Sequence, residues 1–173
     1  MIRRLVIVPP VPALLPRYAS LHDPVAELRA SATGVVRAMT ADAEAVAIVG
    51  QDPFSEPVAR ALLDAAGFTG RIDPDADVVL AMANGSAKRS EKAPGHLDER
   101  AFDFDDVVDL AIRSGDGRRL AALDADLGAE LWASGIGVLA DLGAGLEGPW
   151  SVSVPYADAP YGVLWWVAAW VRD

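Results

Sequence analysis

Short apolar runs alternate along this chain with longer segments in which apolar residues recur at helical spacing. Residues 5–8, 45–49 and 77–82 are the apolar runs, and their β-branched content predicts strands that are buried on both faces. Helices are predicted between them, from Pro24 to about Thr40 and from the cap at Ser55 to near Gly67. Strands that alternate with helices predict parallel βαβ units.

Capping residues set the ends of these two helices. Asp23 followed by Pro24 is typical of a helix start, as is Ser55 with Glu56 in the first turn. Gly67 is the residue expected just beyond the second helix.

The second half of the chain predicts more helix and then a hairpin. Residues 97–113 are predicted to be helical, and a short helix should start at Asp116 or Gly117. Helical spacing continues over 123–142, where Gly135 and Gly137 are expected breaks. Residues 149–155 and 162–170 predict two strands around the turn 156–161, because aromatic and β-branched residues favour strands. A terminal helix is the alternative for the last segment.

The face that the helix over 97–113 turns to the core follows from its apolar spacing. The residues expected to point inward are Phe102, Val107, Leu110 and Ile112. The acidic residues between Asp98 and Asp109 are expected on a solvated face. The predicted fold class is α/β, with one domain over residues 1–173, a mainly parallel central sheet, helices on both faces and a C-terminal antiparallel hairpin.

Composition limits the classes of function. Of the 173 residues, 52% are hydrophobic, which is typical of a globular chain. With 15 basic and 25 acidic side chains, the net charge is −10, which argues against nucleic acid and against anionic membranes as partners. There is no cysteine, so disulfides and thiolate metal sites are excluded.

Two segments superficially resemble targeting signals. The N-terminal run is interrupted by Pro9 and Pro10, which favours a strand followed by a proline-rich loop over a signal peptide. The apolar run 161–171 is shorter than the roughly 20 residues of a membrane helix. We therefore expect a cytoplasmic protein.

The segment 84–95 is the richest in candidate chemistry, and it follows a predicted strand directly. Loops at the carboxyl ends of parallel strands form the sites of open α/β sheets. Asn84, Gly85 and Ser86 could offer backbone N–H groups to an anion, with charge from Lys88, Arg89 and Lys92. The alternative is a surface loop whose charges pair with Glu91 and the acidic helix.

Other candidates lie on neighbouring loops. Gln51 and Asp52 follow the second strand, where Asp52 could act as a base or form a turn before Pro53. Pro10 belongs to a stiff loop that would shape a wall of the site. Tyr156 and Tyr161 flank the final turn and could either line an aromatic-accepting pocket or simply pack there.

Two histidines and two serines are weaker candidates for catalytic residues. His96 could be a general base, although a capping or surface role is the simpler interpretation, and His22 is expected at a helix entry. Ser86 and Ser90 are nucleophiles by residue type only, because no G-x-S-x-G elbow is present.

Three segments together carry a resemblance to a known family. They are the proline-rich loop 9–12, the stretch 85–103 with its Gly-Ser-Ala-Lys-Arg-Ser-Glu-Lys-Ala-Pro-Gly motif, and the Gly-Pro-Trp and Tyr-Ala-Asp-Ala-Pro-Tyr-Gly motifs between 148 and 162. In these the chain resembles the B-subunit-like proteins of the class III extradiol ring-cleavage dioxygenases, and in particular their short actinobacterial members.

The resemblance implies an iron site that this chain lacks. Family enzymes hold a non-haem iron with two histidines and a glutamate, and use another histidine as acid/base. At the histidine positions this chain has Pro10, Gln51 and Ala87, and the glutamate has no clear match. Such an iron needs imidazole and carboxylate ligands, so ring-opening activity and metal binding are expected to be absent.

Three functional hypotheses follow. The first is a metal-free, non-catalytic relative without a cofactor, which binds a small anionic or aromatic ligand, or a protein partner, at the former active site. The second is an enzyme with different chemistry that uses Asp52, Lys88, Arg89 or His96. The third is a structural subunit of a homo- or hetero-oligomer that docks through Trp165, Trp166 or Trp170.

Overall fold

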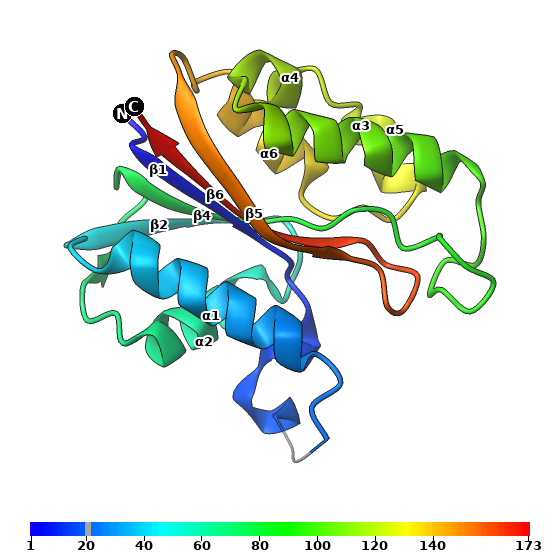
Figure 1. Ribbon diagram of the computed structural model, residues 1–173, viewed down its shortest axis with the longest axis horizontal. Coiled ribbons are helices and arrows are strands. Elements are labelled where there is room, and N and C mark those ends of the chain that lie inside the picture. Colours follow the sequence, from blue (N-terminus) through cyan, green and yellow to red (C-terminus); the bar gives the residue numbers. More distant parts are fainter. Residues whose placement is uncertain (20–21) are drawn as a thin grey trace.

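A six-stranded sheet forms the centre of the computed structural model, which describes residues 1–19 and 22–173 (Figure 1). Its strand order is β3-β2-β4-β1-β6-β5. The strands are β1 (Arg4–Val8), β2 (Ala45–Val49), β3 (Arg71–Ile72), β4 (Val78–Met82), β5 (Trp150–Asp158) and β6 (Trp165–Arg172). The first four are parallel, whereas β6 runs antiparallel to β1 and β5 antiparallel to β6. The predicted parallel sheet and C-terminal hairpin are confirmed.

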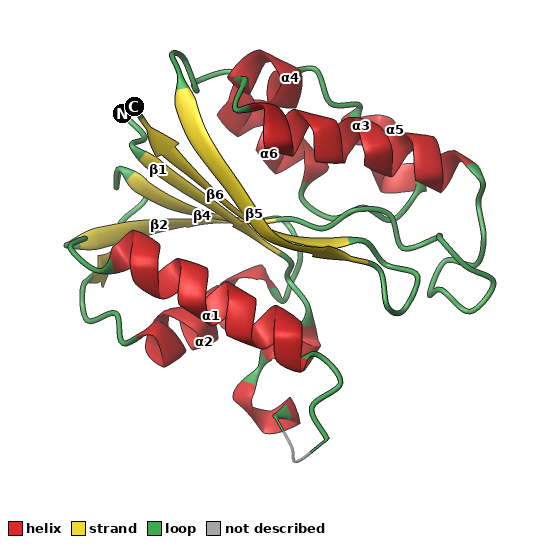
Figure 2. Cartoon of the chain, in the orientation of Figure 1, coloured by secondary structure: helices red, strands yellow, loops and turns green. Residues whose placement is uncertain are grey.

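Helices cover both faces of this sheet, as predicted (Figure 2). On one face lie α1 (Ala26–Thr40) and α2 (Ser55–Ala66), together with the short 3-10 turns η1 (Pro12–Leu14) and η2 (Pro16–Tyr18). On the other lie α3 (Arg100–Ser114), α4 (Gly117–Ala121), α5 (Ala125–Glu130) and α6 (Ile136–Gly143). No helix in the described part of the chain is long and apolar enough to cross a membrane.

The apolar runs form strands because each contributes to two cores at once. On β1, Val6 and Val8 point into the core beneath α1 and α2, and Leu5 and Ile7 point into the core beneath α3–α6. Side chains alternate between the faces of a strand, so a strand covered on both sides must be apolar at every position.

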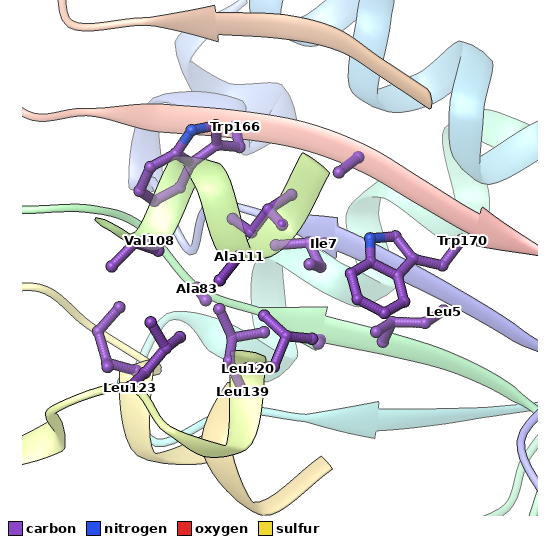
Figure 3. Packing of buried hydrophobic residues seen from close by; sticks show 14 of the residues in the cluster. Leu5, Ile7, Ala83, Val108, Ala111, Leu120, Leu123, Leu139, Trp166 and Trp170 are labelled. Atoms are coloured by element: carbon purple, nitrogen blue, oxygen red, sulfur yellow. The ribbon is translucent and has the colours of Figure 1, made fainter. Parts of the chain in front are cut away.

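The hairpin follows the same rule on its inner strand. On β6, Trp165 faces the core beneath α1 and α2, whereas Trp166 and Trp170 face the core beneath α3–α6. Figure 3 shows these two indole rings among aliphatic side chains of the second core. The alternative of a terminal helix is therefore wrong.

Several predicted element ends shift in the structure. The first helix starts at Ala26 rather than Pro24, although Asp23 still accepts a hydrogen bond from the Val25 amide at 3.0 Å. Ser55 is the first residue of α2 rather than its cap, because Phe54 takes the cap position. The two-residue strand β3 was not predicted, since so short a run carries no periodic pattern.

The prediction for the inward face of α3 is wrong at three residues. Phe102, Val107 and Leu110 are 40%, 59% and 56% exposed, and only Ile112 points inward as predicted. The core-facing residues include Ala101, Phe104, Asp105, Val108 and Ile112. Burial of Asp105 also corrects the expectation that every acidic residue between Asp98 and Asp109 is solvated.

Candidate functional site

The loops predicted to form a site leave the sheet at one edge. Strands β1, β2 and β4 are adjacent and parallel, so the segments that begin at Pro9, Gly50 and Ala83 start side by side. The Ala83 amide donates to the Val8 carbonyl at 2.9 Å, which ties the beginnings of two of these loops together. The predicted convergence of the strand ends is confirmed.

A segment from the distant α5–α6 connection lies against this edge. Residues 131–135 accept hydrogen bonds from the loop after β4: Asn84 N donates to Ser134 O, and Ala87 N to Leu131 O, each at 3.0 Å. Gly135 packs so closely that a Cβ there would lie 2.3 Å from the Met82 carbonyl oxygen. The end of β4 is thus covered by protein.

The backbone donors expected to bind an anion are already bonded within the protein. The Gly85 amide donates to the Leu164 carbonyl at 2.7 Å, and the Ser86 amide donates to Asp105 Oδ1 at 2.7 Å. The expectation that these two N–H groups are exposed is wrong. The physical reason is that a buried amide must find a partner, and here Leu164, just before β6, and Asp105 of α3 supply it.

Asp105 is the acceptor at the centre of this region. Its carboxylate is fully buried, and it also accepts from the Ser86 hydroxyl at 2.7 Å and from Arg89 Nη1 at 2.8 Å. Arg89 in turn stacks over the Phe102 ring, 4.8 Å from its centroid. The expected contact between the loop charges and the acidic helix is thus confirmed for Arg89, but it points inward rather than outward.

The Ser86–Asp105–Arg89 cluster has no catalytic geometry. Ser86 is completely buried, so its hydroxyl has no access to a substrate. The cluster orients the loop instead. Asp105 was missed as a site residue, although its position four residues after Ala101 and three before Val108 places it on the buried face of α3.

The basic residues of the loop diverge. Lys88 Nζ lies 5.7 Å from the centroid of the exposed Trp132 ring, on the side of the α5–α6 connection. Arg89 and Lys92 instead line a depression of about 480 Å³ against the β5–β6 turn. Tyr161 lines the same depression, with Ser90, Ala159, Pro160 and Gly162 completing it.

This depression combines positive charge with an exposed ring. Tyr161 is 50% exposed and its ring lies 5.9 Å from that of Trp165, at an interplanar angle of 53°. No carboxylate is among the residues that line it. The backbone holds its two sides together, because Arg89 N donates to Gly162 O at 3.0 Å.

The remaining predicted site residues lie apart from it. Pro10 is buried and Gln51 is exposed beside α6, where a Cβ on Gly137 would lie 3.7 Å from the Gln51 amide. Asp52 accepts from the Phe54 amide at 2.7 Å, which supports the turn interpretation. Tyr156 packs on the α1 and α2 side, where burial raises the pKa of its phenol.

Neither histidine lies in an enclosed site. His22 and His96 are both exposed, and His96 Nδ1 lies 3.3 Å from the Glu91 carbonyl oxygen. Within residues 1–19 and 22–173, no group of three or more histidine, cysteine, aspartate or glutamate side chains has the geometry to hold a metal ion. Pro10 and Ala87, which the resemblance would align with iron-binding or acid/base histidines, do not fit an iron site either, because their side chains offer no donor atom.

The tryptophans of the structural-subunit hypothesis are inside the protein. Trp165 is 5% exposed and Trp166 and Trp170 are fully buried, so none of them offers a surface to another chain. Trp166 also donates from its indole nitrogen to Asp109 Oδ1 at 3.0 Å.

No protein-family model matches the chain, and no curated protein sequence is detectably similar to it.

Proposed function

We propose that this protein is a metal-free, non-catalytic relative of the class III extradiol dioxygenases that binds a small aromatic anion. The binding site is the depression lined by Arg89, Lys92 and Tyr161. The observation that carries the proposal is the chemistry of its walls: two cationic side chains and a half-exposed aromatic ring, with no carboxylate among the lining residues.

The charge balance makes such a place selective for anions. In a chain of net charge −10, a concave surface with two cations attracts small anions that the rest of the surface repels. Lys92 supplies a point charge. The charge of Arg89 is balanced by the buried Asp105 carboxylate, so Arg89 contributes the donors that remain on its guanidinium and Lys92 contributes the positive charge.

Tyr161 provides the apolar part of the recognition. Tyr161 lines the depression with its half-exposed ring, 5.9 Å from the Trp165 ring, and an aromatic ligand would gain from stacking or edge-to-face contact with it. Ligands that join a carboxylate to a ring would therefore use both walls.

A matched pair of probes tests this proposal. Benzoate and benzamide have nearly the same shape and differ in charge, so benzoate should bind and benzamide should bind at least about tenfold more weakly, a difference of about 1.4 kcal/mol. Amide chemical shifts measured by NMR during titration should move at residues 89–92 and 159–162. Added salt should weaken the binding of benzoate.

Variants locate the site. Lys92→Ala and Tyr161→Ala should each weaken benzoate binding, whereas Arg119→Ala removes the same charge from an exposed position on α4 and should not. Equal binding of the two probes, or benzoate binding that both site variants leave unchanged, would contradict the proposal.

A further inference from the structure

An apolar stripe lies on the outer side of α3. Val107 and Leu110 are three residues apart, so they lie on the same face of the helix, and each exposes more than half of its side chain. In Figure 1, α3 runs across the front of the helical layer, with α4, α5 and α6 behind it. Two large aliphatic residues on this outward face are not explained by the chain's own core.

A groove runs beside this stripe, between α3 and the start of α5. We call it the α3–α5 groove; it measures about 390 Å³. Its apolar lining comes from Phe104 and Val107 of α3 and from Leu123 and Leu127 across the groove. Apolar side chains on both walls match what an inserted aliphatic side chain would contact.

The rim of the groove is acidic. Asp103 and Asp124 line it, and Asp106 is exposed on the adjoining turn of α3. Among the residues that the structure describes, none of these three carboxylates forms an ion pair. Arg100 is the basic residue of the lining, and its guanidinium is held by Asp98 at 2.9 Å and Glu130 at 2.8 Å.

The acidic rim argues against a second copy of this chain as the occupant. A two-fold interface sets the same patch against itself, so the acidic rim of one copy would lie close to the acidic rim of the other. The rest of the molecule adds to this repulsion, since the net charge is −10. An occupant with basic residues around an apolar face would complement the same rim.

The walls also decide how an occupant can bind. The amides within α3 are bonded inside the helix, so the groove offers side chains rather than a backbone edge for strand pairing. We infer that the α3–α5 groove docks a basic amphipathic helix of a partner protein, with aliphatic side chains packed on Val107 and Leu127 and with Lys or Arg facing Asp103, Asp106 and Asp124.

A synthetic peptide serves as the probe. A helix-forming peptide of about 15 leucine and lysine residues, with leucine at helical spacing, is long enough to form a helix on the surface. The control peptide has the same composition with leucine and lysine alternating, so it carries the same charge without an apolar helical face. Fluorescence anisotropy gives both affinities, and NMR locates the contact.

The helical peptide should bind with shifts at residues 100–110 and 122–127, and at least about tenfold more tightly than the control peptide. The double variant Val107→Ser with Leu110→Ser should weaken binding by about tenfold. It removes one apolar side chain from the wall of the groove and one from the stripe beside it. Asp103→Asn with Asp106→Asn should weaken binding and reduce its dependence on salt.

Exposed apolar residues elsewhere provide the matched control. Ile72→Ser with Val171→Ser changes residues that are 36% and 41% exposed, and it should leave peptide binding unchanged. Equal binding of the two peptides, or full affinity in the Val107 and Leu110 variant, would overturn the inference. So would dimerisation of the free protein that is lost in that variant, which would assign the surface to a second copy.

Discussion

Asp105 and Ser86 are joined by two hydrogen bonds of 2.7 Å, one from the Ser86 amide to Oδ1 and one from its hydroxyl to Oδ2. This contact fixes the loop after β4 onto α3. With Arg89 bonded to the same carboxylate at 2.8 Å, three donors compensate one fully buried charge.

Removal of this carboxylate should therefore be costly. We predict that Asp105→Ala lowers the free energy of unfolding by about 3 kcal/mol, because it leaves the buried Ser86 donors without an acceptor and removes the partner of Arg89. Denaturation by urea, followed by circular dichroism, measures the change.

Its neighbour on the helix is the control. Asp106 is exposed, so Asp106→Ala should change the free energy of unfolding by no more than about 0.5 kcal/mol. A similar, small effect of both substitutions would show that the buried contact does not stabilise the loop.

Three strands of the parallel sheet could be predicted from sequence because their apolar runs are short and rich in β-branched residues. Runs such as 5–8 and 78–82 are apolar at every position, as a strand buried on both faces must be. The meeting of their loops at one edge then followed from the shared direction of parallel strands.

The face of α3 could not be predicted in the same way, because apolar residues occupy two sides of it. Phe104 and Val108 point inward, and Val107 and Leu110 point outward with comparable hydrophobicity. Only contacts with residues distant in sequence decide between them. The burial of Asp105, which local pattern predicted least well, required donors from a loop 16 to 19 residues earlier.

The segment that covers the end of β4 could not be predicted from local sequence patterns either. Segment 131–135 contacts Asn84 and Ala87 through main-chain hydrogen bonds. Such bonds do not depend on the type of side chain, so the sequence does not indicate them. Trp132 and Gly135 both have left-handed backbone in this segment, at φ +58° and +77°, and only the glycine is a residue type that favours it.

Two glycines should respond oppositely to alanine. Gly34 lies within α1 with no atom within 4 Å of an added Cβ, so Gly34→Ala should stabilise the protein by about 0.5–1 kcal/mol. At Gly135 a Cβ would meet the Met82 carbonyl oxygen at 2.3 Å, in a left-handed conformation. Gly135→Ala should therefore destabilise by at least about 2 kcal/mol, as measured by urea denaturation. If both substitutions stabilised the protein, segment 131–135 would not pack closely against β4.

Acid should weaken the contact between Asp23 and Arg29. Arg29 donates to the Asp23 carboxylate at 2.6 Å, and this hydrogen bond is the main reason that the pKa of Asp23 lies below the ordinary aspartate value of 3.8. A carboxylate with a lowered folded-state pKa stabilises the protein above its unfolded pKa, and the contribution is lost as pH falls through the folded pKa. Asp23→Asn should thus lower the melting temperature at neutral pH and make little difference in strong acid.

The partner residue gives the control for this pH effect. The variant Arg29→Met removes the hydrogen bond that does most to lower the pKa of Asp23. In that variant, the effect of Asp23→Asn on the melting temperature should no longer be large at neutral pH and small in acid. A pH-dependent effect of Asp23→Asn that persists without Arg29 would assign the stabilisation to another group.

The purified protein should carry no stoichiometric iron, manganese or zinc, and it should not cleave catechol. The reason is chemical: Pro10 and Ala87 have no donor atom, and a carboxamide such as that of Gln51 is a weak ligand for iron compared with imidazole. Elemental analysis after incubation with metal and dialysis against metal-free buffer tests binding, and oxygen uptake with catechol tests activity. A stoichiometric metal that survives dialysis, or oxygen uptake that a chelator abolishes, would show that this chain builds a metal site from other residues.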